Sequence, residues 1–276
     1  MMRFSTSDGL KLYYEDEGSG LPVLCLPGLT RNARDFDDVA PHLDGCRVIR
    51  LVSRGRDRSD FDPDPSNYTV TIEARDVVEL LDHLQLERVV VLGTSRGGLI
   101  AMTLAATAKK RLAGVVLNDI GPRIEPDGLQ KIIDYIGVPP KGRDFTEVGA
   151  ALNAAMGDDF PGISDLRWTM LAERWFEETR DGIALKYDPK LAEVVKEGSS
   201  APAPDLWPLF DMLEGIPLGV IRGENSNLLS ASILEEMQLR RPDMASATVP
   251  DRGHVPFLDE DESLGVIKKV IEMVDR

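Results

Sequence analysis

The sequence predicts an α/β fold, in which a mostly parallel, doubly wound sheet carries helices on both faces. Short apolar runs rich in strand-forming residues recur at 23–26, 48–52, 89–92, 115–117 and 218–221, each closely followed by Gly, Pro, Asn or Ser. Runs that are apolar at every position suit strands buried on both faces of a parallel sheet. Helical patterns lie between these runs, and strands that alternate with helices give a doubly wound sheet.

The first and last elements follow from local patterns. Residues 3–7 and 11–15 flank a Ser-Asp-Gly turn, so we expect the chain to open with a hairpin. One apolar stripe indicates a helix before the run at 89–92, and a second indicates a helix at the end of the chain. Both stripes have the spacing i, i+3, i+4, i+7: Val77, Leu80, Leu81 and Leu84, then Ile267, Val270, Ile271 and Val274.

The alternation of strands and helices breaks after Asn118-Asp119. From about 123 to 205 we find no convincing strand, only helical pieces, and the strand–helix rhythm resumes after Leu206. The sequence therefore predicts a core made of residues 1–122 and 206–276. A helical cap, residues 123–205, is inserted after the sixth strand.

Composition excludes some classes of partner. The 276 residues carry a formal net charge of −15, which opposes binding to nucleic acid or to an anionic membrane. No stretch approaches 18 consecutive apolar residues, and the N-terminus has no apolar signal-peptide core. The two cysteines show no CxxC or Cys/His metal spacing. We expect a cytoplasmic protein without a metal, whose partner is a small molecule; the sequence does not determine its oligomeric state.

A tight turn links the run at 89–92 to a helix of small residues. It reads Gly93-Thr94-Ser95-Arg96-Gly97. A serine on such a turn is held in a strained backbone conformation, and small residues two before and two after it let neighbouring segments approach. The serine hydroxyl then projects from the carboxyl edge of the sheet, and the N-terminus of the following helix points at it.

With these elements in this order, nearly the whole chain resembles the α/β-hydrolase superfamily, of the capped, carboxylesterase-like serine hydrolase kind. Gly93–Gly97 matches the nucleophile elbow of that family, which makes Ser95 the expected nucleophile. Cys25–Thr30 matches the oxyanion turn, with Pro27 where the family often has His. The resemblance implies that the backbone N–H groups of Leu29 and Arg96 hold the oxyanion, and that no organic cofactor takes part.

Of the three histidines, His254 is the expected general base. It follows Gly253 on the loop before the last helix, where the family places its catalytic histidine. His83 lies in an amphipathic helix and His42 follows Pro41 near a helix end, so both are expected to face solvent.

The acid of the expected triad is the member that departs from the family pattern. In the family it follows the run at 218–221, and there this chain has Gly223-Glu224-Asn225-Ser226-Asn227, with Asn227 in place of the expected Asp. In serine proteases the same exchange lowers kcat by about 10⁴, because the amide has no charge and favours the wrong tautomer. Asn227 thus predicts a triad whose acid has lost its negative charge and which orients His254 imperfectly.

Three explanations for an amide at the acid position compete. In the first, Asn227 marks an impaired enzyme or a ligand-binding pseudoenzyme. In the second, another carboxylate takes the place of the acid, and in the third, the reaction tolerates an Asn-oriented histidine, as in Cys-His-Asn enzymes. The best substitute is Asp119, at the end of the neighbouring strand, although it could equally cap the exit of the chain toward the cap. Asp251 and Glu224 are further candidates that we expect to face solvent.

Other positions also depart from the family pattern. Val52 stands where an acid is usual, and Asp57 and Asp251 stand where glycine is usual. Asp tolerates a left-handed backbone better than most residues, so we expect the fold to survive these exchanges.

Four aromatic residues are candidates for an apolar pocket under the cap: Trp168, Trp175, Phe176 and Trp207. They could instead simply join the cap to the core. The Arg96 side chain could meet a substrate carboxylate or a local acid.

These residues predict a hydrolase of a small carboxylic ester or lactone. A serine nucleophile argues against epoxide hydrolases and dehalogenases, which use Asp. The alternatives are a small-ligand-binding pseudoenzyme and a carbon–carbon bond hydrolase that uses the same Ser/His pair.

Overall fold

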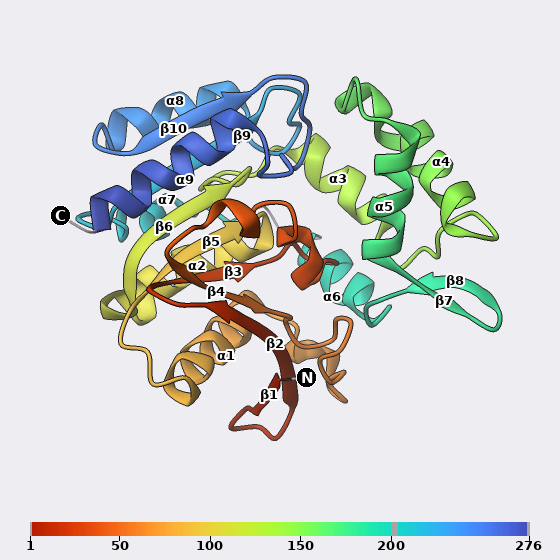
Figure 1. The fold of residues 1–276 in the computed structure, drawn as a ribbon, viewed down its shortest axis with the longest axis horizontal. Coiled ribbons are helices and arrows are strands. Elements are labelled where there is room, and N and C mark those ends of the chain that lie inside the picture. Colours follow the sequence, from red (N-terminus) through yellow and green to blue (C-terminus); the bar gives the residue numbers. More distant parts are fainter. Residues whose placement is uncertain (1, 200–203, 275–276) are drawn as a thin grey trace.

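One mixed sheet forms the centre of the computed structural model, which describes residues 2–199 and 204–274. Its eight strands lie in the order β1-β2-β4-β3-β5-β6-β9-β10 (Figure 1). In chain order they are β1 (Met2–Ser5), β2 (Lys11–Gly18), β3 (Leu21–Leu26), β4 (Cys46–Leu51), β5 (Val89–Thr94), β6 (Leu112–Asn118), β9 (Leu218–Gly223) and β10 (Ala245–Val249). Strands β1, β2 and β4 pair antiparallel, and the pairs from β4 to β10 are parallel. The predicted opening hairpin and doubly wound sheet are confirmed.

Helices cover both faces of the sheet, because alternate strand residues enter two separate cores. Leu24, Val91 and Val220 pack with α1 (Val70–His83), α2 (Arg96–Thr107), α7 (Trp207–Asp211) and α8 (Ala231–Arg240). Val23 and Val90 pack with α9 (Asp261–Val274) and the 3-10 turns Ala33–Phe36 and Ala40–His42. Further 3-10 turns are Pro65–Asn67 and Lys109–Arg111.

The two predicted helical stripes are confirmed. In α1 the residues Val77, Leu80 and Leu81 are fully buried, and the Thr69 side chain caps the helix by accepting a hydrogen bond from the Ile72 N–H. In α9 the residue Val270 is fully buried, and Ile271 and Val274 pack against the same core. None of the described helices is long and apolar enough to cross a membrane.

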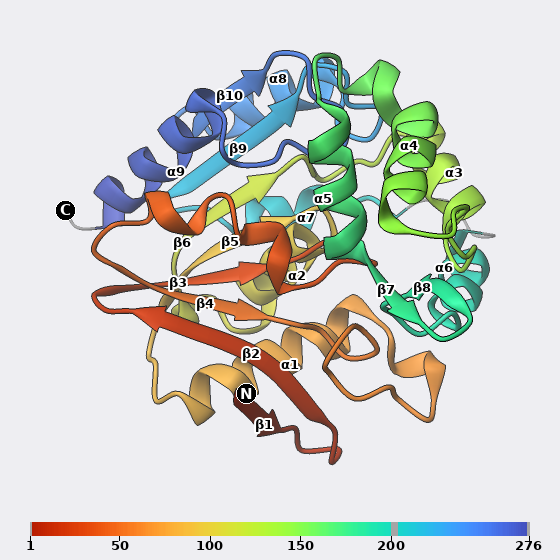
Figure 2. The same ribbon diagram turned by 45° about the vertical axis from the view of Figure 1, so that its right-hand side comes forward.

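The segment between β6 and β9 forms a cap at the edge of the sheet where the parallel strands end (Figures 1 and 2). It contains α3 (Pro126–Tyr135), α4 (Phe145–Met156), the 3-10 turn Gly157–Asp159, α5 (Asp165–Trp175), β7 (Phe176–Thr179), β8 (Gly182–Leu185) and α6 (Leu191–Ser199). The predicted boundaries, 123 and 205, stay a prediction, and residues 200–203 of that range lie outside the described part.

One expectation about the cap is wrong, because it contains a hairpin. Strands β7 and β8 pair antiparallel across a tight turn, with Gly182 at φ +114°. Each strand has four residues, and β7 begins directly after α5. Such short strands leave no periodic signal, and the Asp181-Gly182 turn was the feature that could have indicated them.

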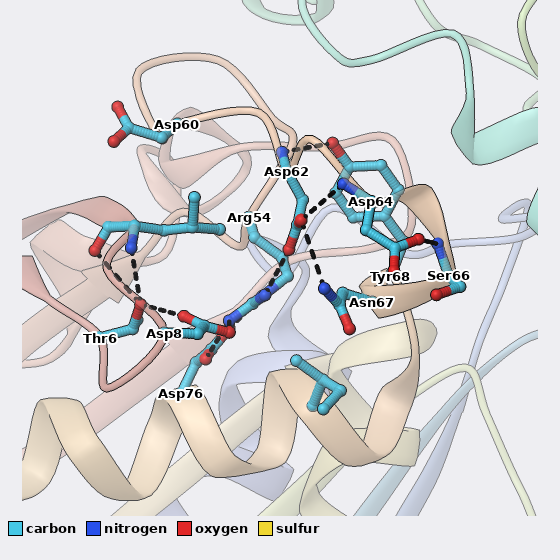
Figure 3. Close-up of polar contacts among 12 residues, drawn as sticks. Thr6, Asp8, Arg54, Asp60, Asp62, Asp64, Ser66, Asn67, Tyr68 and Asp76 are labelled. Atoms are coloured by element: carbon cyan, nitrogen blue, oxygen red, sulfur yellow. Dashed lines mark hydrogen bonds and ion pairs between the residues drawn. The ribbon is translucent and has the colours of Figure 1, made fainter.

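A buried arginine ties the start of the chain to the loop after β4. Arg54 is fully buried and donates hydrogen bonds to Asp76 on α1 (2.7 Å), to Asp62 (2.6 Å) and to Asp8 (3.0 Å) (Figure 3). The hydroxyl of Tyr68 accepts a hydrogen bond from the backbone N–H of Asp62. The loop is thereby held against α1, close to the turn that follows β5.

The two aspartates expected to adopt a left-handed backbone do so. Asp57 has φ 41° and Asp251 has φ 56°. The chain therefore keeps the local conformation that glycine supplies elsewhere.

Candidate active site

Ser95 stands on a strained turn between β5 and α2. Its backbone has φ 50° and ψ −112°, a combination that non-glycine residues rarely adopt. The flanking glycines make the turn possible. A Cβ on Gly93 would lie 2.6 Å from the Gly97 carbonyl, and a Cβ on Gly97 would lie 2.0 Å from the Leu26 carbonyl oxygen. The nucleophile elbow is thus packed directly against β3.

Three side chains form a continuous line of hydrogen bonds. The Ser95 hydroxyl lies 2.9 Å from Nε2 of His254, and Nδ1 of His254 lies 2.7 Å from Oδ2 of Asp119. Because a carboxylate only accepts, Nδ1 carries the proton and Nε2 is free to accept one from the serine. The structure thereby brings together the predicted nucleophile, the predicted base and the alternative acid.

Asp119 is held in place from three sides. It follows β6 with φ 55° and is fully buried. Besides His254, its carboxylate accepts hydrogen bonds from the backbone N–H of Gly223 at 2.8 Å and from the hydroxyl of Ser226 at 2.6 Å. Gly223 ends β9, which pairs with β6, and Ser226 lies in the loop that follows β9. The neighbouring strand thus orients the acid toward the imidazole.

The predicted partnership of Asn227 with His254 is wrong. Nδ1 of His254 is bonded to Asp119, and the loop after β9 turns Ser226, not Asn227, toward that carboxylate. The backbone carbonyl of Asn227 instead packs against Gly128 on α3, where a Cβ would approach it to 2.4 Å. Position 227 therefore belongs to the contact between the core and the cap.

The two remaining acid candidates and the two other histidines face solvent, as expected. Glu224 and Asp251 are exposed, and Glu224 accepts a hydrogen bond from the Asp251 N–H at 3.2 Å. His83 is exposed, 3.3 Å from the Tyr14 hydroxyl, and His42 is exposed as well.

The turn after β3 lies against the elbow. A Cβ on Gly28 would lie 3.9 Å from Cβ of Ser95, so the Gly28-Leu29 backbone faces the serine. The carbonyl oxygen of Leu29 accepts a hydrogen bond from Nε of Arg56 at 2.8 Å. That hydrogen bond anchors the turn on a buried side chain, because Arg56 is itself buried.

A buried glutamate connects this turn to the elbow. The Arg96 side chain pairs with Glu73 at 2.7 Å. Of the two possible partners, a substrate carboxylate and a local acid, Arg96 therefore has the local acid. Arg56 also pairs with Glu73, at 2.8 Å. Burial acts to raise the pKa of Glu73, but the charges of Arg56 and Arg96 outweigh it and hold that pKa below its usual range.

A small cavity of about 40 Å³ lies beside His254. Its walls include Arg31 from the turn after β3, Asn118 from the end of β6, and Arg174 and Trp175 from α5. Apolar walls come from Met156, Phe160, Leu171 and Phe257. The cavity therefore has a mixed lining, in which the carboxylates of Asp35 and Asp38 accompany the two guanidinium groups.

Of the three tryptophans expected to line a pocket, Trp175 lines this cavity. Trp168 is wholly buried inside the cap, with its ring centroid 6.1 Å from that of Phe160. Trp207 lies on α7 behind the sheet, where it packs on Phe210 and under Arg240. Trp168 and Trp207 do not line this cavity, and both serve the packing of their own layers.

Sequence reasoning missed Ser226, Glu73 and the polar wall of the cavity. Glu73 had a usable signal, because it stands four residues before Val77 on the apolar stripe of α1, and a charged residue on such a stripe must be paired. Ser226 had none, since its contact depends on the pairing of β6 with β9. Among the described residues, no group of three or more His, Cys, Asp and Glu is arranged to hold a metal ion.

Comparisons with known proteins agree with this architecture. A family model described as "Alpha/beta hydrolase family" matches residues 23–264. The chain is 36% identical over 263 residues to a 3-hydroxybutyrate-oligomer hydrolase of Cupriavidus necator, covering 90% of this chain and 88% of that one. It is 26% identical to a 2-(acetamidomethylene)succinate hydrolase of Mesorhizobium japonicum, over 96% and 92% of the two chains.

A crystal structure of an α/β hydrolase from Novosphingobium aromaticivorans superposes with a TM-score of 0.91 at 41% identity, covering 98% of this chain and 97% of that chain. The predicted fold class and the resemblance stated from the motifs are both confirmed.

Proposed function

This chain belongs to the α/β-hydrolase family, and from that premise we propose that it is a serine-dependent hydrolase of small carboxylic esters that works through an acyl-enzyme. The observation that carries the proposal is the line of hydrogen bonds from Ser95 through His254 to Asp119. A serine hydroxyl is a weak nucleophile until a neighbouring base accepts its proton, and this line supplies that base with an orienting carboxylate.

In the first half-reaction, Ser95 Oγ attacks the ester carbonyl carbon while His254 Nε2 accepts the serine proton. The carbonyl oxygen gains negative charge in the tetrahedral intermediate, and the N–H groups of Leu29 and Arg96 donate to it. Loss of one such donor costs about 10²–10³ in kcat in related chemistry. When the C–O bond breaks, His254 returns the proton to the departing alcohol, and the acyl group remains on Ser95.

In the second half-reaction, a water molecule attacks the acyl-enzyme. His254 accepts a proton from that water and then returns it to Ser95 Oγ as the acid product leaves. Asp119 stays ionised throughout: it holds the imidazole in one tautomer and stabilises the imidazolium formed in each half.

With Asp119 as the acid, the exchange at Asn227 leaves the charge of the triad intact. The expectation of an impaired enzyme, and the pseudoenzyme hypothesis with it, rested on an amide next to His254. The carboxylate at Nδ1 of His254 supports full activity instead. The 3-hydroxybutyrate-oligomer hydrolase supports a hydroxy-acid ester as the substrate, since it is a 36% identical relative.

Hydrolysis of p-nitrophenyl butyrate by four forms of the protein tests the proposal. Ser95→Ala should abolish turnover. Asp119→Asn should lower kcat by about 10⁴, because the amide loses the charge and favours the wrong tautomer. Asn227→Asp, the matched exchange in the opposite direction, should change kcat by no more than a few-fold. A large gain from Asn227→Asp together with a harmless Asp119→Asn would assign the acid to position 227.

A further inference from the structure

Arg31 enters the cavity beside His254 from the turn that carries Leu29. Its Cγ lies 3.4 Å from the point where a Cβ on Gly28 would stand, and Cβ of Ser95 lies 3.9 Å from that same point. The Arg31 side chain therefore starts next to the serine and extends along the cavity wall. A group bound to its guanidinium would share this cavity with His254.

The guanidinium of Arg31 is stacked on an aromatic ring. Its Cζ lies 3.4 Å from the ring centroid of Trp175, which is itself 7% exposed. Stacking fixes the plane of a guanidinium and leaves its N–H groups pointing outward along the edge, in the fork that matches a carboxylate. The arrangement pre-organises Arg31 for a planar anion.

Two acids, Asp35 and Asp38, line the same cavity, and each accepts hydrogen bonds from side chains other than Arg31. Asp38 accepts hydrogen bonds from Arg174 at 2.5 and 2.9 Å and from Arg167 at 2.8 Å. Asp35 accepts one from the Trp175 indole N–H at 2.9 Å. Burial raises the pKa of Asp35, and the charge of Arg31 opposes that effect only in part. Within residues 2–199 and 204–274, no hydrogen bond or ion pair joins an acid to the Arg31 guanidinium.

Two residues that line the same cavity each have a buried polar atom without a hydrogen-bond partner among the described residues. These atoms are Nε of Arg174, on a residue 5% exposed, and Oδ1 of Asn118, on a residue that is fully buried. Leaving such atoms unpaired costs free energy, so a polar occupant is favoured there over a purely apolar one.

We propose that Arg31 binds a free carboxylate of the substrate, with Nε of Arg174, whose other nitrogens pair with Asp38, as a second donor. The preferred substrates are then esters whose acyl part carries a second, ionised acid group a few carbon atoms from the scissile carbonyl. The inference rests on the proposed function, because it places this acid group relative to the acyl carbon on Ser95. A role for Arg31 as a clamp between core and cap is the competing explanation, and it predicts no dependence on substrate charge.

Two esters of matched shape separate these explanations. One is mono-p-nitrophenyl glutarate; the other is p-nitrophenyl 5-methylhexanoate, in which an isopropyl group replaces the carboxylate. The quantity to measure is the ratio of kcat/KM for the acidic ester to kcat/KM for the neutral ester. Arg31→Met keeps an unbranched stem over Trp175 and removes the charge, so the ratio should fall at least about tenfold. Arg31→Lys should lower it less.

Arg34→Met is the matched control. Arg34 follows Arg31 closely in the chain, its side chain is 44% exposed, and it pairs with Asp37 on the surface. Its removal should leave the ratio unchanged. If the ratio is also unchanged in Arg31→Met, the carboxylate site is overturned while the hydrolase proposal stands. Should Arg31→Met not fold, by circular dichroism and melting temperature, Arg31→Gln carries the same expectation.

A binding measurement keeps the two proposals distinguishable. In the Ser95→Ala background, glutarate is titrated while the tryptophan fluorescence is recorded, because Arg31 lies on Trp175. Adding Arg31→Met should weaken glutarate binding at least about tenfold. If glutarate binds through Arg31 but the unaltered protein hydrolyses neither ester, the hydrolase proposal fails and the carboxylate site stands. If glutarate binds equally well with and without Arg31, the site is overturned.

Discussion

At the scale of single residues, the carboxylate of Asp119 is the hydrogen-bond partner of Nδ1 in His254. Asp119 directly follows β6, and position 227 lies in the loop after the adjacent strand β9. Both positions lie at the carboxyl edge of the sheet, because β6 and β9 are neighbours. A carboxylate can therefore reach the same imidazole from either strand end, and only the orientation of the side chains distinguishes them.

Glu73 carries the sharpest prediction at this scale. It is buried and pairs with both Arg56 and Arg96, which hold the Leu29 turn and the elbow. Glu73→Gln leaves the buried guanidinium of Arg56 and the partly buried guanidinium of Arg96 without their counter-charge. We expect a loss of about 3 kcal/mol or more in the free energy of unfolding in urea, together with a lower kcat. Asp82→Asn on the same helix removes an exposed ion pair to Arg111 and should cost about 1 kcal/mol or less.

The destabilisation caused by Glu73→Gln should depend on pH, because the pKa of Glu73 is lowered in the folded protein. The pKa of Glu73 in the folded protein lies below its ordinary value of 4.5, so the folded state binds fewer protons than the unfolded state as pH falls past 4.5. The stability that Glu73 contributes is complete above that pH and is lost as pH falls toward the lowered pKa. The difference between the native protein and Glu73→Gln should therefore narrow below about pH 4. A constant difference from pH 7 to pH 3 would contradict the role of its charge.

At the scale of elements, the elbow depends on how closely β3, β5 and α2 approach one another. A Cβ on Gly97 would overlap the Leu26 carbonyl oxygen at 2.0 Å, and that atom belongs to strand backbone that cannot rotate away. Glycine at 97 is therefore required by packing, although its helical backbone is one that alanine could adopt.

Gly97→Ala should thus destabilise the protein by about 3 kcal/mol or more and abolish esterase activity. Gly265→Ala is the matched control, because Gly265 lies in α9 with open space around its Cα. There the same exchange should stabilise the protein by about 0.5–1 kcal/mol. Thermal unfolding of the two variants beside the native chain measures both effects. Equal effects would mean that helix propensity, and not the contact with Leu26, governs position 97.

At the scale of the whole molecule, the sheet is covered on both sides, and its central strands are closed to solvent. Cys25 on β3 is fully buried, and burial raises the pKa of its thiol to about 12. Because the thiolate is the reactive form, Cys25 should resist iodoacetamide at pH 8 in the native protein and react readily in urea. Peptide mass spectrometry over time measures this. Rapid native labelling of Cys25 would show that β3 opens without global unfolding.

Local causes account for the features that the sequence predicts correctly. Strand runs, the two helical stripes, the elbow around Ser95 and the loop histidine His254 depend on residues close together in the chain. The β7–β8 hairpin was missed because two four-residue strands carry too little periodicity to stand out.

The remaining features depend on which strand ends and loops become neighbours in space, and on how their side chains are oriented there. The pairing of β6 with β9 brings both strand ends near His254, and the side-chain orientations then select Asp119, with Ser226 as its donor. The partner of Arg96 and the placement of Arg31 over Trp175 bring together segments separated by 23 and 144 positions in the chain. Contacts between segments so distant leave no pattern in the sequence, since the energy that favours them appears only when the core has assembled.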